Sequence, residues 1–284
     1  DAITTGGNCT AVGMSALSSN TTANDNTAVG YNALFSNTTA ANNTAVGRSA
    51  LFANTSGTEN VAVGAQALDA NTTARFNTAV GHLALSGNTT AEANTGIGRT
   101  SLFANTTGAS NTGCGCATLE NNTTGNDNNA FGHHSLDANT TGNDNCAFGK
   151  HSLGSNTTAV NNTAFGSNAL ALNTTGQSNV AVGAFSLDAC TTGNDNVSIG
   201  QNALTTSTDA SNNTAVGGAA LGVNTSSNMT AVGRSALGAN TSGSQNTAIG
   251  YRALVSNTTG GSQTATGFEA LVSATGGSND AFGR

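Results

Sequence analysis

Three histidines lie close together in the sequence and are suited to metal chemistry. His133 and His134 are neighbours, and His151 lies one repeat interval after His134. Imidazole nitrogens bind transition metals such as zinc, copper and nickel. His134 and His151 are therefore candidate metal ligands if the fold brings positions separated by this interval together. No carboxylate or cysteine occupies this repeat position in the adjacent copies, so we expect the rings to stack at a surface.

Aspartates recur at the same interval. The string Thr-Gly-Asn-Asp-Asn occurs three times and contributes Asp127, Asp144 and Asp195. Facing carboxylates of Asp127 and Asp144 could share a calcium ion, because Ca²⁺ prefers oxygen ligands. The string lacks the G-G-x-G-x-D spacing of calcium-binding repeats. We therefore expect these aspartates to be solvated turn residues.

The cysteines form neither a disulfide framework nor a zinc site by their spacing. Each replaces a different residue of the surrounding pattern: Cys9, Cys114, Cys116, Cys146 and Cys190. We expect five free thiols, with Cys114 in the core. No set of residues supports catalysis, so we expect neither enzymatic activity nor a cofactor.

Asparagine followed by threonine is the most frequent polar signal. The string N-T-T or N-T-S is formally an acceptor of N-linked glycans and occurs thirteen times. Glycans at every copy would collide, and internal asparagine ladders explain the string as well, so sparse glycosylation is the alternative. Candidate acceptors are Asn20, Asn37, Asn71, Asn88, Asn105, Asn139, Asn156, Asn173 and Asn257.

All these intervals reflect one seventeen-residue tandem repeat. Aligning on the string N-T-A-V-G at 26–30 gives the consensus N-T-A-V-G-x-x-A-L-x-x-N-T-T-x-x-x. Single-residue deletions before Met229 and before Asn279 are the only interruptions. We number the columns of the repeat 1 to 17 from Asn26. Column 5 is glycine in every copy, which predicts a positive φ or a close backbone neighbour there.

The repeat length matches one coil of a solenoid. We expect T-A-V-G and A-L to form short strands and N-T-T-x-x-x to form a polar turn. Coils stacked about 4.8 Å apart turn each column into a ladder. The representative ladder residues are Val29, Gly30, Leu34, Asn37 and Thr38, with the valine and leucine rows inside and asparagines bonded amide to amide. The sequence thus predicts an all-β parallel β-solenoid (β-roll or β-helix) of about 17 coils, forming one uninterrupted, uncapped array over 1–284.

Such a coil has a thin core, because columns 3 and 8 are mostly alanine. We expect self-association to supply the missing burial, either as side-by-side trimers or as end-to-end polymers through uncapped ends. Columns 6, 7, 10 and 11 vary and are expected to face partners. Five of the seven basic residues share column 6, which marks it as solvent-facing or as a contact stripe.

The composition excludes several classes of function. Only 7% of residues are charged and the net charge is -7, which argues against nucleic acid as a partner. No apolar run approaches the length of about 18 residues that spans a bilayer, so we expect no membrane insertion.

The N-T-A-V-G-x-x-A-L unit resembles the head repeats of YadA-like trimeric autotransporter adhesins, and it is similar to repeats of phage and viral tail fibres. The resemblance covers the whole chain through one short motif. It implies a parallel β-roll, a homotrimer and a role in a surface fibre or adhesin. The repeat is longer than the autotransporter unit, and no coiled-coil stalk or membrane anchor follows it, so the mode of attachment stays open.

The sequence therefore favours a structural fibre protein that is extracellular, on a cell surface or on a virion, with adhesion to a surface glycan or receptor as a further role. The alternative is a ligand-binding surface for ice or a glycan on the Thr/Asn ladder. The threonine row that contains Thr21, Thr38 and Thr55 has no gap, and it resembles the threonine arrays of ice-binding solenoids. The row lies in a predicted turn, whereas an ice-binding face is expected to carry alternate threonines of one flat strand.

Overall fold

The computed structural model describes residues 6–274 and 276–283, and it confirms the predicted all-β parallel solenoid, whose coils recur at the interval of the sequence repeat. No helix occurs in these ranges. The chain divides into two compact units, Asp1–Asp144 and Asn145–Arg284. Both units are built from the same coil, and each is described by itself.

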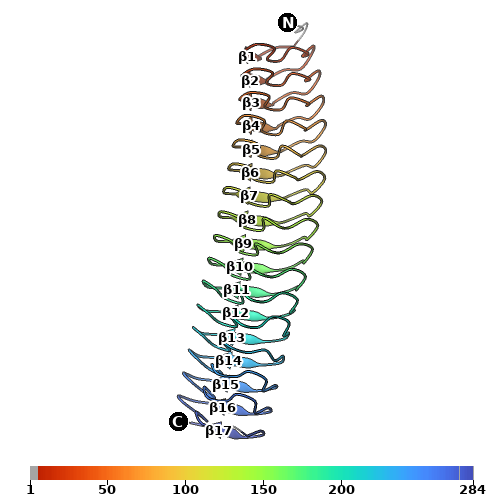
Figure 1. The fold of residues 1–284 in the computed structure, drawn as a ribbon. Coiled ribbons are helices and arrows are strands. Elements are labelled where there is room, and N and C mark those ends of the chain that lie inside the picture. The colour runs from red at the N-terminus through yellow and green to blue at the C-terminus, as the bar shows by residue number, and fades with distance from the viewer. Residues whose placement is uncertain (1–5, 275, 284) are drawn as a thin grey trace. The chain divides into compact units, whose positions relative to one another are not determined.

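The first unit contains eight strands of three residues among the residues described. Each strand pairs in parallel with the next in chain order, and Figure 1 shows them stacked from red to green. The register joins identical columns, as in Thr27↔Thr44 and Val29↔Val46. The strands are β1 (Thr10–Val12), β2 (Thr27–Val29), β3 (Thr44–Val46), β4 (Val61–Val63), β5 (Thr78–Val80), β6 (Thr95–Ile97), β7 (Thr112–Cys114) and β8 (Asn129–Phe131).

The second unit repeats this arrangement with nine described strands, again parallel and paired in chain order. The two shortened coils keep the register, because Thr214 still pairs with Thr230 and Thr264 with Asp280. The strands are β9 (Cys146–Phe148), β10 (Thr163–Phe165), β11 (Val180–Val182), β12 (Val197–Ile199), β13 (Thr214–Val216), β14 (Thr230–Val232), β15 (Thr247–Ile249), β16 (Thr264–Thr266) and β17 (Asp280–Phe282).

Each coil has one strand, and the expected second strand at A-L is a turn instead. Leu34 has a φ of 50°, in the left-handed region, which no extended strand permits. Asn32 and Asn42 share this conformation, with φ of 57° and 61°. The coil reverses direction through these left-handed residues, and the cost of placing a leucine there is offset by its complete burial.

Glycine in column 5 meets both conditions that the sequence predicted. Gly30 has a φ of +136°, and a Cβ built on it would lie 2.5 Å from the carbonyl oxygen of Gly47 in the next coil. The Gly30 amide donates to the carbonyl oxygen of Val12 at 2.8 Å, so the ladder continues past the strand. Any side chain here would push neighbouring coils apart.

The inside of each coil is filled by small residues and leucine. Ala28, Ala33 and Leu34 are completely buried, as are most of their counterparts along both units. Each buried leucine contributes about 1.5 to 3 kcal/mol relative to an exposed one. The Leu34 amide donates to the carbonyl oxygen of Ala50 at 3.0 Å. Neighbouring coils are therefore joined by backbone hydrogen bonds outside the strand as well as within it.

Candidate functional site

The outward face of the sheet is the most regular surface of either unit. Strand residues alternate between the two faces of a sheet. In β2 the middle residue Ala28 is buried, while Thr27 and Val29 on either side are partly exposed. Columns 2 and 4 therefore point outward, in ladders spaced by the coil repeat. We call these two columns the sheet face.

The position of column 4 corrects one expectation. The valine row does not fill the inside of the coil, because column 3 takes the inward position of the strand and only leucine, alanine and asparagine face inward in most coils. Column 4 instead exposes large apolar side chains; Ile97 is 40% exposed and Phe165 is 41% exposed. The sequence carried the signal, since column 3 holds only alanine, glycine or serine and must lie where space is least.

The sheet face carries almost no charge. Among the residues described, Asp280 is the only acidic or basic side chain in columns 2 and 4. The remaining side chains are mostly threonine, valine, isoleucine and phenylalanine. Two of the phenylalanines, Phe148 and Phe165, stack with ring centroids 4.6 Å apart and planes 4° from parallel. A strip with so little charge matches the core of a protein interface more closely than a solvated surface.

Asparagine ladders lie inside the coils, where they fix the position of the sheet face. In column 12, Asn105 Nδ2 donates to Asn88 Oδ1 and to the Gly108 carbonyl oxygen, both at 2.9 Å. In column 1, the backbone N–H of Asn43 donates to Asn26 Oδ1 at 2.9 Å. These side chains are completely buried. Because both protons of such an amide group in column 12 are used, the ladder ties each coil to its neighbour and to its own turn.

The proposed acceptors of N-linked glycans are the column 12 asparagines themselves. All nine candidates, Asn20 to Asn257, are completely buried. For Asn37, the nitrogen that would carry the sugar donates to Asn20 Oδ1 and to the Ala40 carbonyl oxygen. A glycan on such a nitrogen would fill the inside of the coil, so these positions can carry one only where the coil is not folded.

The threonine row of column 13 is used within the coil stack. Thr38 Oγ1 donates to the carbonyl oxygen of Thr55 at 3.3 Å, and Thr106 Oγ1 donates to that of Thr123 at 3.0 Å. The row lies in the turn, as the sequence predicted. Most polar groups of the Thr/Asn ladder suggested for ice or glycan binding therefore form hydrogen bonds within the coil stack. The threonines that point outward from a strand are those of column 2.

Of the candidate metal ligands, His134 pairs with a carboxylate of its own coil. His134 Nδ1 lies 2.8 Å from Asp137 Oδ2, and its ring meets that of His133 edge to face at 4.1 Å. His134 lies in the first unit and His151 in the second. In the described parts of the chain, no group of three or more histidine, cysteine, aspartate or glutamate side chains could hold a metal ion. Asp127 and Asp144 are exposed turn residues.

The cysteines are free thiols in different surroundings. Cys114 is half-buried on the sheet face, so the expected core position is wrong for the same reason as for the valine column. Cys146 is also on this face, and burial raises the pKa of its thiol. Cys190 replaces an asparagine of column 12 and is completely buried. Burial raises the pKa of Cys190 to about 11, and Asn173 Oδ1 in the preceding coil has no hydrogen-bond partner.

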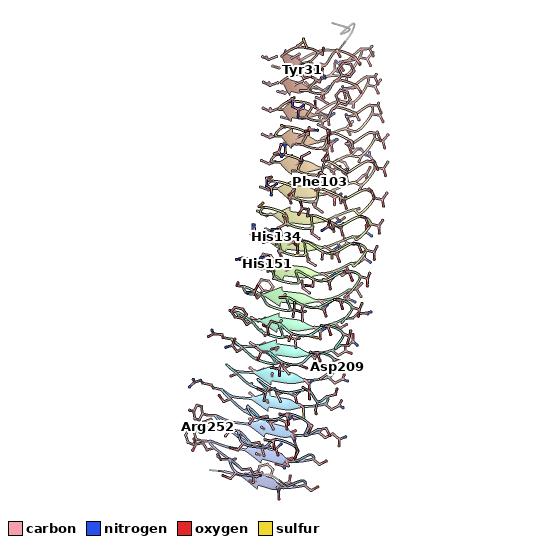
Figure 2. The ribbon with its side chains drawn as sticks, in the orientation of Figure 1. Tyr31, Phe103, His134, His151, Asp209 and Arg252 are labelled. Atoms are coloured by element: carbon pink, nitrogen blue, oxygen red, sulfur yellow. The ribbon has the colours of Figure 1, made fainter. Side chains whose placement is uncertain are left out.

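The variable columns lie at the margins of the coil. Figure 2 shows His134 at the left edge of the first unit and Arg252 at the left edge of the second. Arg252 forms an ion pair of 2.9 Å with Glu269 of the next coil. Tyr251 and Phe268, one residue earlier in each coil, stack with ring centroids 5.3 Å apart. The variable columns at these margins thus carry charged side chains, whereas the sheet face carries almost none.

Comparison with known proteins identifies no relative. No protein-family model, curated protein or solved structure matches the chain. Within the described ranges, no helix has the length and apolar character needed to cross a membrane. The geometry of the coil is therefore the basis for any assignment of function.

Proposed function

We propose that the protein is a structural component of an extracellular or virion fibre, and that its copies associate side by side, as a homotrimer, through the sheet face. The observation that carries this proposal is the almost uncharged strip formed by columns 2 and 4, in which a row of mostly threonine lies beside a row of mostly apolar side chains. The resemblance of the repeat to trimeric adhesin heads and tail fibres agrees with it. Adhesion to a surface glycan or receptor would then use the variable margins.

The area of the sheet face suits a second copy of the chain. Three strand residues by one coil spacing give about 50 Å² per coil. The eight described strands of the first unit offer about 400 Å² and the nine of the second about 450 Å². Each unit thus supplies about half of what one partner contributes to an interface of standard size. Because each column repeats the same kind of side chain, the face of one copy presents the same spacing as the face of another. The ladders of a second copy can therefore fit it coil by coil.

Stiffness follows from the inside of the coil. The asparagine ladders and the backbone hydrogen bonds run along the stacking direction, so bending would stretch many of them together. Disruption of one coil also exposes the neighbours on both sides, since each coil contacts only those next to it. These properties suit a mechanical role and require no bound ligand.

Sedimentation velocity of the purified chain tests the proposal directly. We expect an oligomer of the wild type, and a monomer when Val46→Lys and Val63→Lys are combined on the sheet face. The control is Thr39→Lys, which adds a charge at an exposed turn position away from this face. Circular dichroism shows whether all variants remain folded.

Two results would contradict the proposal. A wild type that stays monomeric at tens of micromolar, with no filaments by electron microscopy, removes the structural role. If that monomer also shapes growing ice crystals or lowers their growth temperature, the outward threonines of column 2 bind ice, and the sheet face is a ligand surface.

A further inference from the structure

Two rows of charged side chains flank the sheet face. Column 17 ends the turn that leads into each strand, and column 6 follows the glycine that ends it. The rows therefore lie at opposite ends of the strands. The backbone is left-handed throughout column 17, with φ of 57° at Asp25 and 60° at Glu59. Charged residues in both rows are exposed.

The two rows carry opposite charge without exception in the described residues. Column 6 contains basic side chains and no acidic one, whereas column 17 contains acidic side chains and no basic one. We call them the basic edge and the acidic edge. The basic edge is Arg48, Arg99, Lys150 and Arg234; the acidic edge is Asp25, Glu59, Asp127, Asp144 and Asp195.

No described ion pair involves either edge. The pairs present are those of Arg75 with Glu92, Arg252 with Glu269 and His134 with Asp137, and all lie in other columns. Arg48 donates to Gln66 Oε1 at 3.0 Å, and this neutral partner leaves the charge of the guanidinium uncompensated. Both edges therefore keep their net charge for a partner.

The separation of charge distinguishes the ways in which two sheet faces can meet. If copies are related by an axis along the stacking direction, they run parallel and the basic edge of one meets the acidic edge of the next. If the axis runs along the strands, the copies are antiparallel and each edge meets its own kind. Like charges placed opposite each other disfavour the second arrangement, and complementary charges steer the first.

We infer that copies of this chain associate parallel and in register, with the basic edge of each copy against the acidic edge of its neighbour. The inference rests on the proposed function, because it specifies how the sheet faces meet. In the first unit it places Arg48 beside two acidic residues of the neighbouring copy. Arg48 follows β3, while Asp25 precedes β2 and Glu59 precedes β4, and β3 pairs with both strands.

Zero-length cross-linking tests this arrangement. The Arg48→Lys variant gives the basic edge an amine that a carbodiimide can join to a carboxylate in direct contact. Copies labelled with ¹⁴N and ¹⁵N are mixed before cross-linking, so that a link between two copies appears as a mixed-isotope peptide. We expect mixed-isotope links from position 48 to Asp25 or Glu59. The control variant Thr39→Lys should give no link to the acidic edge.

Sedimentation at increasing salt provides the second readout. We expect the association constant to fall about tenfold between low and high ionic strength, because exposed charges are screened by salt. An oligomer that links position 48 elsewhere, or that forms equally well at all salt concentrations, overturns the inference and leaves intact only the proposal that copies assemble into a structural fibre. A wild type that is monomeric under every condition removes both.

Discussion

The buried asparagine ladder makes a quantitative prediction for Asn105→Ala. Asn105 makes three ladder hydrogen bonds: two donated by Nδ2, at 2.9 Å each, and one accepted by Oδ1 from Asn122 at 2.8 Å. Each such bond contributes about 1 kcal/mol, and Asn88 Oδ1 left without its donor costs about 1 to 3 kcal/mol more. We expect the free energy of unfolding to fall by about 4 to 6 kcal/mol.

Urea denaturation followed by circular dichroism measures this change. The matched control is Thr107→Ala in the same coil, where the side chain is exposed, and a loss below about 0.5 kcal/mol is expected. If Asn105→Ala costs no more than Thr107→Ala, the ladder does not stabilise the coil and the reasoning fails.

Asn105→Asp sharpens the test, because it keeps the shape of the side chain. An ionised carboxylate cannot donate to Asn88 Oδ1 or to the Gly108 carbonyl oxygen, so burial should raise the pKa of this aspartate above its value in the unfolded chain. The folded state then binds a proton more readily than the unfolded state, and the variant should gain stability as the pH falls toward that range. A variant with the same stability at pH 5 and pH 8 would contradict a dry, fully bonded ladder.

Three further predictions follow from single positions. Gly217→Ala should lower the free energy of unfolding by more than about 3 kcal/mol, because its Cβ would lie 2.6 Å from the Gly233 carbonyl carbon. Gly218→Ala should be tolerated, because the nearest atom to its Cβ would be 3.8 Å away. Thermal denaturation compares the two variants. Burial raises the pKa of Cys190 from 9.0 to about 11, so the unfolded chain loses this proton first and the free energy of unfolding should fall as pH rises through that interval. Urea titrations at pH 8 and pH 10.5 measure the fall, and it should be absent in Cys190→Ser. Thr100 is β-branched with a φ of 54° and a buried hydroxyl without a partner, so Thr100→Asn should raise the melting temperature, and an unchanged value would refute the assigned strain.

The predictions from sequence succeeded where a column has one chemical requirement. Glycine without exception in column 5 indicated a positive φ and close packing, and Gly30 shows both. Leucine in column 9 indicated an inward position, and Leu34 is completely buried. They failed for Val29, because an apolar side chain in a short strand can point inward or outward, and it points outward. They also failed for the A-L segment, because a buried leucine can lie in a turn as well as in a strand.

By itself, the sequence determined the period of the coil, its parallel stacking and the identity of its ladders, because a strict tandem repeat allows equal columns to meet only when coils are stacked in register. The tertiary structure decided how the coil closes, and with it that the A-L segment is a turn and not a second strand. A three-residue strand has apolar residues on both faces, and the coil closes over the smaller ones so that asparagine and leucine fit inside. The same closure moved the asparagines of the glycan motif into the interior and left threonine and valine to form the sheet face.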